Sequence, residues 1–199
     1  MTLWCDIAKI SGEVENGRTV SQIFMHGLTE LGELAQEVII SEGRSYKDPG
    51  ADGVAGEAMD LILCLTDLIL VRTPDIDEVR IAEIWFSSEV DRTEGNLPES
   101  LFTAALKESR KPEAGTDDLM MAMTSKFGEV AQALAEDVAG DTDGLDLISA
   151  PALDAILDCL EIIRIEVPGV DEAGLCSMAA PKLVKWRDTA FQEASPSRT

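Results

Sequence analysis

Apolar residues recur every three to four positions along most of the chain, and turn-forming residues separate these amphipathic stretches. In the first half, the pattern predicts helices at about residues 2–14, 20–42, 54–71 and 76–92. The third stretch stops ahead of Thr73 and Pro74, and the proline disfavours further helix there. The sequence has no convincing alternation of apolar and polar residues of the kind typical of strands. We therefore expect an all-α protein.

The third of these stretches, at 54–71, is apolar almost all round, which is typical of a buried helix. Its polar residues follow one another at steps of three and four and form a single stripe, which consists of Glu57, Asp60, Cys64 and Asp67. A buried carboxylate costs roughly several kcal/mol unless it is paired, protonated or bound to a metal. We therefore expect a cation beside this stripe.

Two pairs of carboxylates, each three residues apart, are candidate metal ligands. Glu30 and Glu33 lie on the second predicted helix, and Glu57 and Asp60 lie on the third. Residues i and i+3 of a helix project from the same face, so each pair presents two carboxylates to one point in space. The alternative is a solvated acidic face, which the apolar surroundings of the third helix disfavour.

The charge of the chain narrows the classes of partner. Its 199 residues include 38 acidic and 16 basic side chains, and the net charge is −22. Such a charge argues against a surface for nucleic acid or for an anionic membrane. The longest apolar run is too short to cross a bilayer, and the first residues lack the basic start and apolar core of a signal peptide. We therefore expect a cytoplasmic protein.

The cysteines are widely spaced and form no CxxC pair; they are Cys5, Cys64, Cys159 and Cys176. This spacing favours reduced cysteines that pack as small apolar side chains over disulfides or a zinc site. The histidine and the tryptophans have two interpretations each. His26, four residues before Glu30, either hydrogen-bonds to it or is a half-exposed or core residue. The tryptophans either stack on a base or pack in the core, and they are Trp4, Trp85 and Trp186.

The second half of the sequence repeats the first. Four blocks match in the same order, at offsets of 98, 96, 94 and 94 residues: 3–11 with 101–109, 30–36 with 126–132, 58–63 with 152–157, and 77–84 with 171–178. In this alignment Phe102 matches Trp4, which favours core packing for that tryptophan. We interpret the pattern as an internal duplication with units at 1–97 and 98–199. We expect the two units to pack as a pseudo-dimer with a four-helix-bundle core.

The second copy keeps two of the four acidic positions and loses the other two. The matched pairs are Glu30 with Lys126, Glu33 with Glu129, Glu57 with Pro151, and Asp60 with Asp154. A lysine at a vacated ligand position can neutralise the remaining carboxylates as a metal ion would. We therefore expect one working site, in the first half, with the second half completing the bundle.

These motifs resemble those of a known family. An ExxE motif, followed after 23 residues by ExxD, within LGELAQEV and an apolar helix, resembles the signature of the all-α nucleoside triphosphate pyrophosphohydrolases. This MazG-like group includes dimeric dUTPases and phosphoribosyl-ATP pyrophosphatases. The specific part of the resemblance is confined to residues 26–67. It implies hydrolysis of a (d)NTP to the (d)NMP and pyrophosphate, in house-cleaning or control of the nucleotide pool.

The resemblance also implies roles for individual residues. Mg²⁺, for which Mn²⁺ can substitute, would be held by Glu30, Glu33, Glu57 and Asp60, and Glu30 or Glu33 would orient or deprotonate the attacking water. Basic residues would contact the substrate phosphates, and the candidates are Arg44, Lys47, Lys182, Lys185 and Arg187. Association into a homodimer is in keeping with the family, although a chain that is already a pseudo-dimer needs no partner.

Two other functions stay open. A phosphoribosyl-ATP pyrophosphatase has the same chemistry, but the duplicated and half-degenerate layout fits it less well. A non-catalytic nucleotide-binding or interaction module would keep the fold without turnover. Separation of Glu30 from Glu57 in space would favour this second alternative. The sequence does not specify the base or the sugar of the substrate.

Overall fold

The computed structural model describes residues 2–14, 17–86, 100–107, 114–136 and 147–194. All regular structure within these residues is helical, and the elements are α1 (Leu3–Glu13), α2 (Val20–Ser41), α3 (Gly53–Arg72), α4 (Glu78–Phe86), α5 (Leu101–Lys107), α6 (Thr116–Ala135), α7 (Ser149–Glu166) and α8 (Glu172–Ala194). The predicted all-α class is confirmed. The last residues of the helix predicted at 76–92, and the boundary between 97 and 98, lie outside the described residues.

Local signals in the sequence explain where the first helices begin and end. Thr19 caps α2, where its hydroxyl accepts a hydrogen bond from the backbone N–H of Gln22 and the Gln22 side chain accepts one from the backbone N–H of Thr19. Thr2 caps α1 in the same way through the N–H of Cys5. α3 ends at Arg72, and Thr73, which precedes Pro74, has left the helical conformation.

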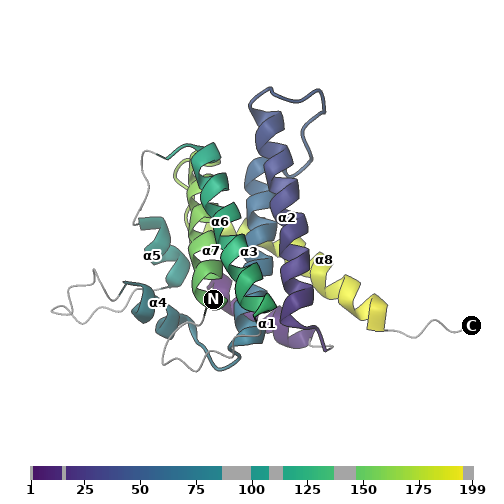
Figure 1. Ribbon diagram of the computed structural model, residues 1–199, viewed down its shortest axis with the longest axis vertical. Helices are drawn as coiled ribbons and strands as arrows, with labels where there is room; N and C mark the ends of the chain where they lie inside the picture. Colours follow the sequence, from purple (N-terminus) through teal and green to yellow (C-terminus); the bar gives the residue numbers. More distant parts are fainter. Residues whose placement is uncertain (1, 15–16, 87–99, 108–113, 137–146, 195–199) are drawn as a thin grey trace, which may run out of the picture.

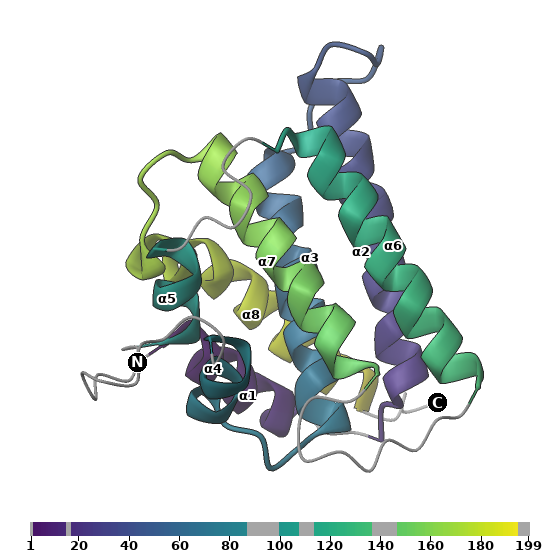
Figure 2. The ribbon, with the colours of Figure 1, turned by 60° about the vertical axis from the view of Figure 1, so that its left-hand side comes forward.

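Four long helices, α2, α3, α6 and α7, run side by side through the molecule (Figures 1 and 2). The most extensive packing is between α2 and α3, between α3 and α7, and between α6 and α7. α8 crosses these helices and contacts α1, α3 and α5, while α1, α4 and α5 lie toward one end (Figure 2). None of the described helices has the length and apolarity needed to cross a bilayer.

The centre of the core is formed by α3 and α7, which are buried around most of their circumference. Fully buried side chains of α3 include Met59, Leu61, Ile62, Leu65 and Ile69. Burial of each such side chain contributes roughly 1.5–3 kcal/mol. The prediction that α3 is a buried helix is confirmed, so the carboxylates of α3 project from a helix whose position is fixed by its neighbours.

The buried face of α2 leaves out one leucine and includes a glycine. Leu28 lies three residues before Leu31 but is 39% exposed, whereas Leu31 and Val38 are buried. Gly27 faces the interior instead, and a Cβ on it would lie 3.4 Å from Cε1 of Phe127. Because this glycine lets the α6 phenylalanine approach the α2 backbone, the buried face includes Gly27 and leaves Leu28 outside.

A glutamate in the first turn of α4 connects the two halves of the chain. Glu78 accepts a hydrogen bond from the hydroxyl of Thr2 at 2.7 Å and one from the backbone N–H of Leu101 at 2.8 Å. Thr2 is the cap of α1, and Leu101 is the first residue of α5. One carboxylate therefore holds the starts of two helices from different halves.

Glu172, in the first turn of α8, has the corresponding contacts in the opposite direction. It accepts hydrogen bonds from the backbone N–H of Leu3 at 3.1 Å and from the hydroxyls of Ser100 and Thr103. Leu3 is the first residue of α1, and Ser100 directly precedes α5. Glu78 therefore reaches the first helix of the second half, and Glu172 reaches the first helix of the first half.

Candidate metal-binding site

The acidic residues of α2 and α3 converge where these two helices pack together. Glu30, Glu33 and Glu57 each offer a carboxylate oxygen, and the three oxygens lie within 4.8 Å of one another. Glu30 and Glu57 are half-buried, and Glu33 is exposed. Glu30 and Glu57 therefore lie together, and the separation that would favour a non-catalytic module is not observed. We call these three residues the acidic triad.

Asp60, the fourth predicted ligand, is half-buried and is paired with a lysine. Lys182 Nζ of α8 donates to Oδ2 of Asp60 at 2.5 Å and to Oδ2 of Asp52 at 2.7 Å. The Lys182 side chain is only 12% exposed. Burial lowers the pKa of Lys182, but the bonds to the two carboxylates outweigh this effect and the pKa is raised. For Asp60, the cation expected beside the α3 stripe is therefore a lysine ammonium.

Asp52 was not among the candidates from the sequence, although an aspartate directly before a helix is a recognisable pattern. An aspartate directly before a helix usually accepts a hydrogen bond from the first turn, but Asp52 makes no such bond and turns to Lys182. Gly56 makes room for it, since a Cβ on Gly56 would lie 2.4 Å from Cβ of Asp52. The hydrogen bond from Lys182 lowers the pKa of Asp52.

Crowding and burial raise the pKa values of the site carboxyls. Burial is the largest cause of the rise of the Glu30 pKa from 4.5 to about 7, and repulsion by Asp60, Glu33 and Glu57 adds to it. Burial also raises the pKa of Glu57 and that of Asp60, in the latter case against the opposing effect of Lys182. A divalent cation among these oxygens would favour their ionised forms.

Two of the basic candidates are engaged away from the triad. Arg44 pairs with Glu42 and, at 3.0 Å, with the exposed Asp117 of α6. Lys47 is exposed and donates to the side-chain oxygen of Gln36 at 2.6 Å. Neither contact includes a residue of the triad.

The other basic candidates lie on α8. Among them Lys182 is the one that contacts a predicted ligand, Asp60. Lys185 is exposed, and its charge acts on Asp52 and Asp60 in the same direction as that of Lys182, though more weakly. Arg187 pairs with its neighbour Asp188 at 3.3 Å. α8 therefore brings positive charge to the acidic residues chiefly through Lys182.

The equivalent place in the second half holds a lysine between two carboxylates. Lys126 Nζ lies 3.3 Å from Glu129 and 3.6 Å from Asp154. These are the two acidic positions that the second half keeps, and the contacts agree with the expectation that a lysine neutralises them. Pro151, which stands where the first half has Glu57, is buried and offers no ligand atom.

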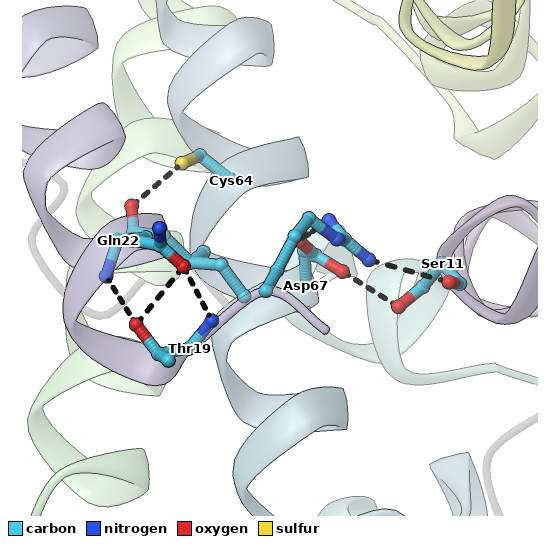
Figure 3. A network of polar contacts seen from close by, with 7 residues as sticks. Ser11, Thr19, Gln22, Cys64 and Asp67 are labelled. Atoms are coloured by element: carbon cyan, nitrogen blue, oxygen red, sulfur yellow. Dashed lines mark hydrogen bonds and ion pairs between the residues drawn. The ribbon is translucent and has the colours of Figure 1, made fainter. Parts of the chain in front are cut away.

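Asp67, at the far end of the α3 stripe, has its own partners (Figure 3). It is 3% exposed and accepts hydrogen bonds from the hydroxyl of Ser11 at 2.6 Å and from the guanidinium of Arg18. Arg18 in turn lies over the ring of Trp186, 5.3 Å from its centroid. This network holds α1, α3 and α8 together, so the structure assigns Asp67 an ion pair within the fold.

Several other candidate residues are also placed. His26 is exposed, and Trp4 is buried with 3% exposure, as is its counterpart Phe102 with 0%. The side chain of Trp85 lies outside the described residues. The four cysteines are free thiols, and Cys64 donates to the carbonyl of Ile23 (Figure 3). The expectation that all cysteines are packed is wrong for Cys5, which is exposed on α1.

A buried glutamate beyond the triad fixes the loop between α2 and α3. Glu37 is 5% exposed, and both of its oxygens accept from the backbone N–H of Gly50, at 2.9 and 3.0 Å. Glu37 lies one helical turn after Glu33 on α2, so the same helix carries two candidate ligands and the anchor of the loop. This contact holds the loop residues that lead into Asp52 and α3.

The donor set of the triad fits a hard divalent cation such as Mg²⁺ or Mn²⁺, because all the ligand atoms are carboxylate oxygens. Within the described residues, it is the one group of at least three acidic, histidine or cysteine side chains whose potential ligand atoms lie this close together. No family model, curated protein or solved structure matches this chain. The features of this chain that bear on its function are therefore the geometry of the site and the motifs of the sequence.

Proposed function

We propose that this protein is a Mg²⁺-dependent nucleoside triphosphate pyrophosphohydrolase of the MazG-like kind, which splits a (d)NTP into the (d)NMP and pyrophosphate. The convergence of Glu30, Glu33 and Glu57 is the observation that carries the proposal. Repulsion by Glu33 and Glu57 adds to the rise in the pKa of Glu30, and a divalent cation would relieve this repulsion. The ExxE and ExxD motifs that supply them resemble those of this family.

The tandem arrangement is part of the proposal. We infer that the chain is a duplicated unit whose halves pack as a pseudo-dimer around α2, α3, α6 and α7. The crossed contacts of Glu78 and Glu172 support it, since these two residues occupy matching positions in the sequence repeat. Each accepts from the N–H of the first residue of the other half's first helix. Such exchange is expected of two units related by an internal two-fold axis.

The residues of the site have distinct roles in this mechanism. Glu30, Glu33 and Glu57 would hold the ion, and Asp60 would be a fourth ligand if Lys182 released it. Bound Mg²⁺ supplies positive charge that polarises the phosphate and acidifies water. Glu33 is the exposed member of the triad, so it is the one placed to orient or deprotonate the attacking water, with Glu30 as its neighbour on the same face. Among the basic candidates, Lys182 contacts the predicted ligand Asp60, so it would be placed to meet a phosphate bound to the ion.

The experiment that tests the proposal measures pyrophosphate release from a panel of ribo- and deoxynucleoside triphosphates with Mg²⁺. It compares the wild type with Glu33→Gln and with Glu129→Gln, which changes the matched exposed residue of the second half. We expect Glu33→Gln to lower kcat roughly 100-fold or more and Glu129→Gln to leave it within about twofold. Absence of release from every nucleotide, together with Mg²⁺ binding, would overturn the hydrolase proposal.

One observation favours the alternative function, that of a nucleotide-binding module without turnover. Asp60, which would complete the ligand quartet, is neutralised by Lys182. If this ion pair persists when a nucleotide binds, the site keeps three acidic ligands and loses the fourth. The same panel separates the two functions, because a module of this kind would bind Mg²⁺ and nucleotide but release no pyrophosphate.

A further inference from the structure

Lys182 occupies an unusual place for a residue that would contact substrate phosphate. Its ammonium group bridges Asp60 and Asp52, both on or next to α3, although it comes from α8, 122 residues after Asp60 in the sequence. With 12% of its side chain exposed, it is held in the site and is not solvated. In the structure, this lysine holds the carboxylate that the metal ion would need.

We propose that Lys182 is an internal counter-ion that competes with the divalent cation for Asp60 and moves to the polyphosphate when metal and substrate bind together. This inference rests on the proposed function and deepens it. Because Lys182 lies on α8, the second half of the chain would then control how the site in the first half is assembled. Divalent cation and polyphosphate would then bind synergistically, each weakly alone.

The competition follows from charge and position. An ammonium in contact with Asp60 and a divalent cation at the same carboxylate repel each other. As long as Lys182 stays, a cation at the triad has three carboxylates, and its affinity is lowered by a positive neighbour. The burial of Lys182 sharpens this effect, because solvent screens a partly buried pair less than an exposed one.

Lys182 can move to a phosphate because it has a second partner, Asp52. Asp52 holds Lys182 independently of Asp60, and it lies in the segment that Glu37 anchors through Gly50. If Asp60 binds the metal ion, Asp52 therefore still holds the Lys182 ammonium beside the site. A flexible lysine stem there can reach an anion bound to the same cation, and the phosphate supplies the acceptors that Asp60 no longer gives.

The second half provides a natural comparison. Lys126 also neutralises two carboxylates, but it lies on the same helix as one of them, Glu129, and the pair at 3.3 Å is three residues apart. The equivalent residue of the first half is Glu30, itself a member of the triad. A lysine supplied by a distant helix can withdraw without leaving a gap in the ligand set, whereas Lys126 occupies a ligand position permanently.

The test measures Mn²⁺ binding to the full chain, with and without inorganic tripolyphosphate, by isothermal titration calorimetry. The first variant, Lys182→Met, removes the charge. The second, Lys182→Gln, serves if the Met variant folds poorly, because its neutral amide can still donate a hydrogen bond to Asp60. Lys9→Met, which changes an exposed lysine of α1 that pairs with Glu13, is the control. The readout is the ratio of Mn²⁺ affinities with and without tripolyphosphate.

For the wild type and Lys9→Met, we expect tripolyphosphate to tighten Mn²⁺ binding about tenfold beyond its effect on free Mn²⁺. For Lys182→Met and Lys182→Gln, we expect Mn²⁺ alone to bind about tenfold more tightly and the synergy to fall below about twofold. Weaker Mn²⁺ binding by both Lys182 variants, or unchanged synergy, would overturn the proposal. Neither readout requires turnover, so intact synergy without pyrophosphate release counts against the hydrolase alone.

Discussion

The same pair of helical positions holds an open acidic site in one half of the chain and a neutralised one in the other. On α2 and α3, three glutamates converge, and Glu30 has a pKa raised to about 7 by burial and by its acidic neighbours. On α6 and α7, Lys126 lies between the two remaining carboxylates. The first arrangement is electrostatically unfavourable without a bound cation, and the second carries its own.

Two positions separate the halves, because Lys126 stands in the place of Glu30 and Pro151 in the place of Glu57. A lysine in place of a central carboxylate removes a ligand, reverses a charge and supplies the counter-ion for the residues that remain. The first half instead receives its lysine from α8, a separate helix, and keeps the triad. The unfavourable charge of the first half is thus consistent with a role in binding a cation.

The largest effect is expected when the first half is given the charge pattern of the second. Glu30→Lys places an ammonium where Lys126 stands in the second half, and we expect Mn²⁺ affinity to fall at least about 100-fold, equivalent to about 2.7 kcal/mol. The same variant relieves the repulsion within the triad, so its metal-free form should unfold at a higher temperature than the wild type. Calorimetric titration and thermal unfolding in a chelator measure the two effects.

The reciprocal variant is the control. Lys126→Glu restores a carboxylate to the second half, but Pro151 still offers no ligand, so we expect no new Mn²⁺ site and a loss of stability below about 1 kcal/mol. If Glu30→Lys kept the Mn²⁺ affinity of the wild type, the triad would not be the binding site.

The crossed glutamates give the next largest effect, on the free energy of unfolding. Glu172→Gln leaves one carbonyl oxygen for three donors, and we expect a loss of about 2 kcal/mol in urea unfolding. Glu78→Gln, at the matching position with two donors, should cost about 1–2 kcal/mol. Glu166→Gln, an exposed residue at the end of α7, is the control and should change little. A loss at only one of the two matching positions would argue against the two-fold arrangement.

The sequence predicted those features of the site that depend on local periodicity. The i, i+3 spacing is enough to predict that Glu30 and Glu33 share one face of α2 and that Glu57 and Asp60 share one face of α3. That Glu57 meets Glu30 and Glu33 depends on how α2 packs against α3. The repeat is enough to predict the place of Lys126. The Lys182 contacts could not be predicted in this way, because they depend on how α8 crosses α3. Asp52 was missed for a related reason, since its position suggested a helix cap.

Partners decided other cases that the sequence left open. Asp67 continues the polar stripe of α3, and spacing alone does not separate it from Asp60. The two differ because Arg18, in the segment before α2, reaches Asp67, whereas Lys182 reaches Asp60. Distant segments supply both partners, so only the packed structure shows that Asp67 belongs to an internal ion pair.

A smaller effect is expected in the pH dependence of the metal-free protein. The folded-state pKa of Glu30, about 7, is above its ordinary value of 4.5. Between these two pH values the folded state holds a proton that the unfolded state has lost, so stability falls as the pH rises through this window. At pH 8 we expect Glu30→Gln to be more stable than the wild type by about 1–2 kcal/mol, after allowance for solvent screening.

At pH 4.5 the difference between Glu30→Gln and the wild type should be much smaller, and Glu129→Gln should show no comparable trend. Urea unfolding in a chelator across this range measures the differences. Addition of Mg²⁺ at pH 8 should reverse the order, because the wild type then gains stability from binding and the variant gains less. A constant difference at all pH values would contradict the assignment of this effect to ionisation of Glu30.

The smallest effect concerns a position where α3 is polar and α7 is apolar. Thr66 is fully buried and, among the described residues, its hydroxyl has no hydrogen-bond partner; the matching residue of α7 is the buried Leu160. Thr66→Val keeps the shape and removes the unpaired hydroxyl, so we expect a gain of about 0.5–1 kcal/mol in urea unfolding. Thr66→Ser, which keeps the hydroxyl and loses the methyl group, should be less stable than the wild type. A loss of stability in Thr66→Val would mean that the hydroxyl bonds to a helix carbonyl in solution, and α3 would then use its polar position as α7 cannot.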